Sequence, residues 1–135
     1  MGSGVFKPGN SNLIMLRVYG IVTRNNTTLL VKGQDKVWRL PGVQFREKID
    51  DIMLASNSFK KWMKESMDID IETEGVAYED SSEDSDSLFL KIKKFSGQIN
   101  DQVESQWVEF DHMDKGILEI LPSHKNAVFV SALSK

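Results

Sequence analysis

Basic side chains gather on one face of the strongest predicted helix, which spans residues 50–67. Asn57, Lys61, Lys64 and Glu65 recur at spacings that place them together, opposite the apolar residues of the same segment. Ammonium groups in this arrangement can bind a phosphate group directly. The same face can equally be a solvated surface on which Lys61 and Glu65 form a weak i,i+4 ion pair. Both interpretations stay open at the level of the sequence.

Further candidates for this ligand site precede the helix. Arg39 and Arg46 are close to it in sequence and can add positive charge, so we predict them as ligand contacts with Lys61 and Lys64. Trp38 flanks the turn at residues 40–42 and is the tryptophan best placed to stack on a ligand. A tryptophan at such a position can equally belong to the core.

Acidic residues offer a second kind of site. Glu47, Asp50 and Asp51 come directly before the helix, where they can hold a divalent cation or act as ordinary capping and dipole residues. Residues 79–86, with the sequence EDSSEDSD, hold five acidic residues and no apolar side chain. This composition predicts a solvated loop. His112 and His124 are too isolated to form a metal pair, and His124 is expected to be structural or exposed.

Composition limits the class of protein. The chain has 135 residues, 40% of them hydrophobic and 27% charged, and it has no cysteine, which excludes disulfides, thiol catalysis and cysteine-based metal sites. The net charge of −3 conceals an asymmetry, because residues 1–64 carry 11 basic and 4 acidic residues. This asymmetry can steer an anion toward one face, or the two halves can neutralise each other. With no signal peptide and no apolar stretch of about 18 residues, we expect a soluble, intracellular protein without a membrane partner.

Hydrophobic periodicity predicts an α+β fold. We expect residues 1–12 to be a flexible segment and 13–135 to be one domain. The order of the elements is strand, strand, short strand, helix, strands and helix, which predicts one mixed sheet covered by helices. Strands are expected at 13–23, 27–32, 37–40, 69–78 with an interruption near Gly75, 88–95 and 107–110, and helices at 50–67 and 122–133.

The segment Val37-Trp38-Arg39-Leu40-Pro41-Gly42, followed by a loop and an amphipathic helix, resembles the Nudix hydrolase family. The later segments 88–90, 106–108 and 121–124 fall in the order of that fold, so that the resemblance covers nearly the whole chain from Leu13. It implies a Nudix-like α/β/α sandwich with a mixed β-sheet. The family pattern is G-x5-E-x7-R-E-U-x-E-E-x-G-U, with U apolar, and its glutamates hold Mg²⁺ against a pyrophosphate.

Alignment of this pattern on residues 60–68 places its R-E pair on Lys60-Lys61, its E-E pair on Lys64-Glu65 and its glycine on Met67. Only Glu65 then remains of the metal-binding carboxylates, and it is the candidate catalytic residue. A lysine at a metal position repels a divalent cation. We therefore expect no bound cofactor.

The main hypothesis is a non-catalytic binding or regulatory module for a nucleotide or another phosphorylated ligand. The first alternative is an active Nudix hydrolase that cleaves a nucleoside diphosphate derivative with Mg²⁺ or Mn²⁺. In that case Glu65 would bind the metal together with Glu47, Asp50 or Asp51. The second alternative is a domain that binds RNA or a protein partner and keeps only a vestigial cleft, because Nudix-like proteins without a working box include RNA-binding and regulatory members.

Overall fold

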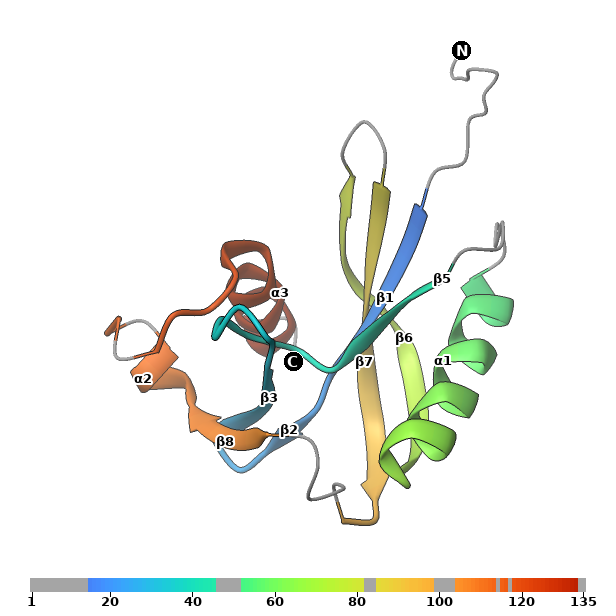
Figure 1. Ribbon diagram of the computed structural model, residues 1–135, viewed down its shortest axis with the longest axis horizontal. Coiled ribbons are helices and arrows are strands. Elements are labelled where there is room, and N and C mark those ends of the chain that lie inside the picture. Colours follow the sequence, from blue (N-terminus) through green and yellow to red (C-terminus); the bar gives the residue numbers. More distant parts are fainter. Residues whose placement is uncertain are drawn as a thin grey trace.

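A computed structural model describes residues 15–45, 52–81, 85–98, 104–113, 115–116 and 118–133 of the chain (Figure 1). Several predictions made above concern residues outside these ranges, namely the flexible segment 1–12, the site candidates Arg46, Glu47, Asp50 and Asp51, and part of the acidic stretch. The described elements are β1 (Met15–Ile21), β2 (Thr23–Arg24), β3 (Thr27–Lys32), β4 (Trp38–Arg39), β5 (Gly42–Phe45), α1 (Ile52–Met67), β6 (Asp70–Ser81), β7 (Ser85–Ser96), β8 (Ser105–Glu109), α2 (Phe110–Met113) and α3 (Pro122–Leu133).

A mixed sheet forms the centre of the fold. Its strand order is β5-β1-β7-β6, with β1 parallel to β7 and the other neighbours antiparallel. Helix α1 lies on one side of this sheet and α3 on the other (Figure 1). The predicted α/β/α sandwich with a mixed sheet is therefore confirmed. A second, antiparallel sheet of β2, β3, β4 and β8 accompanies it, whereas the sequence pattern predicted one sheet.

Both faces of the central sheet are buried, because successive side chains of a strand point to opposite sides. In β1, Leu16 and Val18 belong to the core cluster that α1 covers. Tyr19 and Ile21 instead join the cluster formed with α3 and the second sheet. The side chains of β1 therefore contribute to both core clusters.

Helix α1 packs through residues spaced four apart. Ala55, Phe59, Met63 and Met67 are buried, as the predicted helical periodicity requires. The ring of Phe59 lies so close to β1 that a Cβ at Gly20 would come within 2.9 Å of its Cε2 atom. A residue with a side chain at that position would therefore push the helix away from the sheet.

The predicted loop at residues 79–86 is wrong in the part that the structure describes. Strands β6 and β7 continue into this stretch, and the ladder pairs Glu79 with Leu88, Asp80 with Ser87 and Ser81 with Asp86. The acidic side chains of Glu79 and Asp80 are exposed, so solvation of the charges is compatible with a hydrogen-bonded backbone. The interruption predicted near Gly75 is confirmed, because the ladder shifts register there and Gly75 has a φ of 115°.

Three short segments have a secondary structure that differs from the prediction. The prediction missed β5, which exists because residues 42–45 pair with β1. The predicted first strand is divided, since β1 ends at Ile21 and β2 begins at Thr23 in the other sheet. Phe110, predicted as the end of a strand, begins the short helix α2.

Candidate functional site

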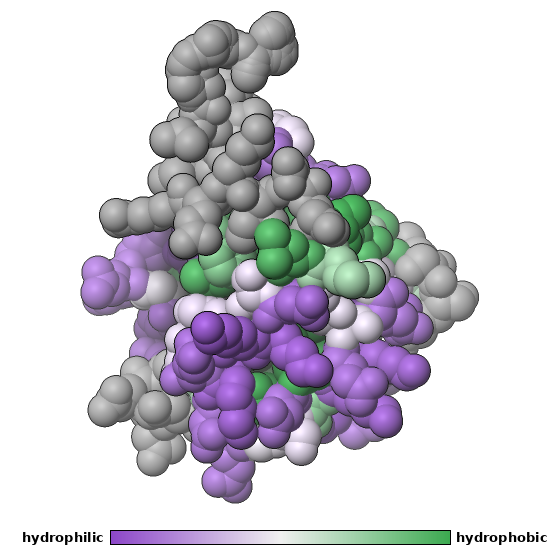
Figure 2. Space-filling view, turned by 90° about the vertical axis from the view of Figure 1, so that its right-hand side faces the viewer, coloured by the Kyte–Doolittle hydropathy of each residue, from purple (hydrophilic) through white to green (hydrophobic). Residues whose placement is uncertain are grey.

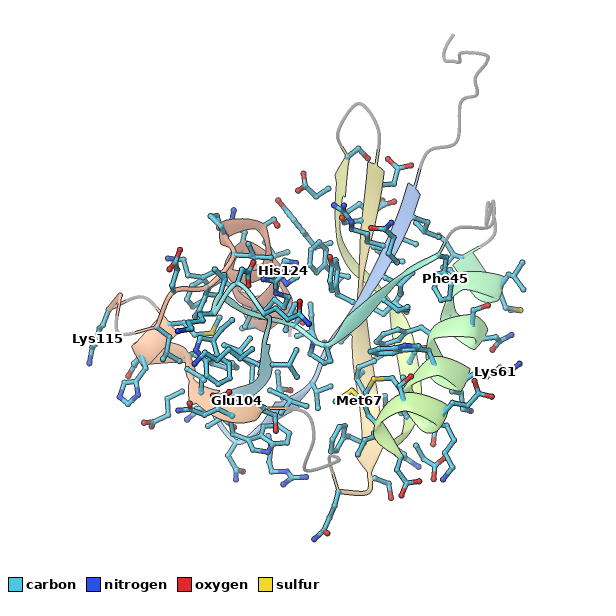
Figure 3. The ribbon with its side chains drawn as sticks, viewed as in Figure 1. Phe45, Lys61, Met67, Glu104, Lys115 and His124 are labelled. Atoms are coloured by element: carbon cyan, nitrogen blue, oxygen red, sulfur yellow. The ribbon has the colours of Figure 1, made fainter. Side chains whose placement is uncertain are left out.

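The exposed side of α1 carries the predicted basic face. Lys60, Lys61, Lys64 and Glu65 are all exposed, on the side of the helix opposite its buried residues. Figure 3 shows Lys61 extending away from the sheet into solvent. The helix ends after Met67, where Asp68 adopts the left-handed conformation with a φ of 57° and Ile69 is again fully buried.

A shallow pocket of about 330 Å³ lies between this face and the start of β6. Four of the six lining residues belong to the face predicted from the sequence, and two, Lys60 and Asp70, do not. The lining residues are Asn57, Lys60, Lys61, Lys64, Glu65 and Asp70. Lys60 stands one helical turn before Lys64, so helical spacing alone was sufficient to find it. Asp70 belongs to the next strand, and its position depends on how the chain turns after α1.

The three lysines differ in their partners. The Nζ atom of Lys64 lies 3.4 Å from Asp70 Oδ2 and 3.5 Å from Asp68 Oδ1, and the charge of Asp70, followed by its hydrogen bond and by Asp68, raises the pKa of the Lys64 ammonium. Lys60 and Lys61 have no ion pair with any residue that the structure describes. The predicted Lys61–Glu65 pair is therefore wrong within this part of the chain. Asp70, folded back beside the helix end, engages Lys64 instead.

The described carboxylates of this pocket do not fit a divalent metal ion. Mg²⁺ requires oxygen ligands in near-octahedral geometry, whereas Glu65 and Asp70 share the pocket with three ammonium groups. Over the described ranges there is no group of three or more His, Cys, Asp or Glu side chains that could hold a metal.

Arg39 and Trp38 lie in another part of the molecule. Both belong to β4 of the second sheet, and neither lines the lysine pocket. The Arg39 guanidinium binds Asp35, with 2.6 Å from Nη2 to Oδ1, and this hydrogen bond is the main cause of a lowered Asp35 pKa. The Trp38 side chain is 7% exposed and belongs to the core cluster beside α3, so its ring offers little surface to a ligand.

A buried histidine lies beside Arg39. His124 is 3% exposed, which agrees with the structural role expected for it, and its Nδ1 atom accepts a hydrogen bond of 3.0 Å from the Leu40 N–H. Its ring contacts Tyr19 edge-on at a centroid distance of 4.2 Å. Burial, and secondarily the charge of Arg39, lower the pKa of His124 to about 4. Burial raises the pKa of Tyr19. This cluster keeps its histidine neutral and joins α3 to the turn at Leu40.

The Arg39 side chain has one further property. Its Nε atom is buried and has no hydrogen-bond partner among the described residues. The sequence contains no local signal for the burial of His124 or for the buried Nε atom of Arg39. A lone histidine after Pro122 and a lone arginine in a short strand are both common patterns.

Comparison with known proteins supports the fold alone. The sequence matches no protein-family profile and no curated protein. Among solved structures, the ORF135 protein of E. coli superposes with a TM-score of 0.71 at 12% identity, covering 94% of each chain. A MutT structure from work on Aliivibrio salmonicida and Vibrio cholerae gives a TM-score of 0.69 at 17% identity, covering 88% of this chain and 98% of that one. An ADP-ribose pyrophosphatase of Streptococcus suis gives 0.64 at 16% identity, covering 90% and 91%.

Other similar structures are described as Nudix hydrolases, so the chain has a Nudix-like fold, as the resemblance implied. They offer no support for an RNA or protein partner. Across the described residues, no helix is both long enough and apolar enough to cross a membrane.

Proposed function

We propose that this protein is a Nudix-like module that binds a nucleotide or another phosphorylated ligand without hydrolysing it. The phosphate group would be held by Lys60 and Lys61. The observation that carries the proposal is that these two ammonium groups line one pocket and make no ion pair within the described part of the chain. Lys64 completes the basic rim, but Asp68 and Asp70 already engage it.

The non-catalytic part of the proposal is supported by the end of α1. The last glycine of the family pattern is best aligned on Asp68, whose φ of 57° is one that glycine adopts most easily. The apolar positions of the pattern then fall on Met63 and Ile69, which are fully buried. This alignment differs by one residue from the one based on sequence.

In the new register Lys61 and Lys64 no longer replace glutamates. The R-E pair falls on Lys61-Trp62 and the E-E pair on Glu65-Ser66. Trp62, at a carboxylate position, stacks on Phe59 with a centroid distance of 5.8 Å. Glu65 keeps a glutamate position in both registers, and one exposed carboxylate is a weak site for Mg²⁺.

Binding at this pocket should be weak and salt-dependent. Lys60 and Lys61 are exposed, and ions screen exposed charges over a distance of about 10 Å at 0.1 M ionic strength. A lysine ammonium binds phosphate as a point charge and does not require one fixed geometry. The pocket is therefore suited to select for anionic charge.

The test is a ³¹P NMR titration of the full chain with pyrophosphate and ADP, with and without Mg²⁺. We expect shifted or broadened phosphorus signals and no new ones. The double substitution K60E/K61E should abolish the shift. The substitution K115E is the matched control, because Lys115 lies on the opposite side of the molecule (Figure 3). Unchanged signals with the unmodified protein, or an equal loss in K115E, would overturn the binding site.

The same experiment examines the hydrolase alternative. New phosphorus signals that grow with time in Mg²⁺ would overturn the non-catalytic reading and favour an active hydrolase. The substitution E65Q would then show whether Glu65 is the residue that carries the reaction.

A further inference from the structure

We propose that the phosphorylated ligand is a peptide segment of a partner protein, which lies along α1 with its phosphoryl group at Lys60 and Lys61 and an aliphatic side chain in an adjoining groove. This inference rests on the proposed function, because the same lysines hold the phosphoryl group. It adds a second contact region and a class of partner.

The groove lies directly beside the lysine pocket. It has a volume of about 490 Å³ and extends between the first turns of α1 and the bulged part of β6. Asn57 lines both the groove and the lysine pocket, so that the two adjoin at this residue. The other lining residues of the groove are Ile52, Met53, Ser56, Thr73, Gly75 and Leu90.

Apolar surface is concentrated at this end of the helix. Ile52, Met53 and Leu54 are 53%, 72% and 50% exposed. Figure 2 shows apolar surface over the start of α1 and hydrophilic surface over the rest of that face. Three consecutive exposed apolar residues are unusual on a surface that contacts only water, and they indicate an interaction site.

The chemistry of the groove favours an aliphatic side chain over a nucleobase. Proteins recognise unstacked bases by stacking them on aromatic rings or arginine planes, and neither kind of side chain is among the described residues that line this groove. The hydroxyls of Ser56 and Thr73 hydrogen-bond each other at 2.6 Å, so they do not need a polar ligand. The flexible side chain of Met53 adapts readily to an aliphatic partner.

The groove has free space where β6 carries Gly75, because glycine has no side chain to fill it. No described heavy atom lies within 4 Å of the position that a Cβ of Gly75 would occupy. The amide of Asn57, at the junction of the two regions, can donate to and accept from the backbone of an extended peptide.

The spacing of the two regions matches a short peptide. Met53 and Lys61 are eight residues apart on α1, which corresponds to about 12 Å along the helix axis. An extended peptide covers that distance in about four residues. The partner segment should therefore carry a phosphorylated residue and, about four positions away, a leucine or a residue of similar shape.

The test is fluorescence anisotropy with a labelled peptide in which a phosphoserine has a leucine four positions away on each side. We expect saturable binding to the full chain, and weaker binding by about fivefold or more after either dephosphorylation or replacement of both leucines by serine. The substitution M53S should weaken the binding by about fivefold. V130S is the matched control, because Val130 is also an exposed apolar residue of a helix but belongs to α3 and does not line the groove.

The outcomes separate this inference from the function on which it rests. If ADP and pyrophosphate bind through Lys60 and Lys61 but the peptide does not, the peptide inference fails and the proposed function stands. Equal losses of peptide binding in M53S and V130S would also contradict the role of the groove. If neither the small phosphates nor the peptide binds, both proposals fail.

Discussion

Replacing His124 by asparagine removes a titrating group from the core while keeping a hydrogen-bond acceptor near the position of its Nδ1 atom. The Leu40 N–H, which donates to Nδ1 at 3.0 Å, then retains a partner. In the native protein, protonation of Nδ1 would abolish this bond and place a charge in a site that is 3% exposed. The histidine must therefore be neutral for the fold to be stable.

The size of the effect follows from the two pKa values. The folded pKa of about 4 lies below the 6.5 of an unperturbed histidine, so the unfolded state takes up the proton first as the pH falls. The stability that His124 contributes is therefore complete above pH 6.5 and is lost as the pH falls toward 4. Between pH 7 and pH 4.5 the loss amounts to about 2.5 kcal/mol.

The assay is urea denaturation followed by tryptophan fluorescence at several pH values between 7 and 4.5. The H124N variant should be less stable at pH 7 by about 1 to 2 kcal/mol, because the smaller side chain fills less of the site. This difference should disappear or reverse at pH 4.5, where only the unsubstituted protein has lost the histidine contribution. Titration of carboxylates affects both chains equally and cancels in the comparison.

The H112N variant, in which the same substitution is made at an exposed histidine, serves as the control and should follow the unsubstituted protein at every pH. A stability difference between H124N and the unsubstituted protein that stays constant from pH 7 to pH 4.5 would refute the reasoning.

Two further substitutions test the close packing at Gly42 and the backbone conformation at Asp68. G42A should destabilise the fold by about 1 to 3 kcal/mol, because the added Cβ would overlap the ring of Tyr19 and lie 2.6 Å from the backbone oxygen of Val18; a melting temperature equal to that of the native protein would contradict this. D68G should stabilise the fold by about 0.5 to 1 kcal/mol, because a residue other than glycine is strained at a φ of 57°; denaturant unfolding that shows a loss instead would mean that the Lys64–Asp68 contact matters more than the backbone.

Much of the architecture could be predicted from local patterns. The spacing of Ala55, Phe59 and Met63 predicts a helix that buries one face, because a helical turn returns a side chain to the same side every three to four residues. The same periodicity placed Lys61, Lys64 and Glu65 together, and the structure finds all three in one pocket. The order of strands and helices was sufficient to predict a mixed sheet covered by helices, and the resemblance to the Nudix family implied the α/β/α sandwich.

Other features depend on contacts between residues far apart in the chain. Strand β5 exists because it pairs with β1, and the acidic stretch around Asp80 is a ladder because β7 lies beside it. Arg39 is close to the lysine helix in sequence, but its strand belongs to the other sheet, where Asp35 engages it.

The sequence alone thus determined which face of α1 is basic, because that face depends only on the helical repeat. Only the tertiary structure decided which lysines have partners and what adjoins them. Asp70 engages Lys64, and Gly75 opens a groove beside Met53, because β6 returns along the helix. His124 is neutral for the same kind of reason, since α3 carries it into the core, where desolvation outweighs its ordinary tendency to take up a proton.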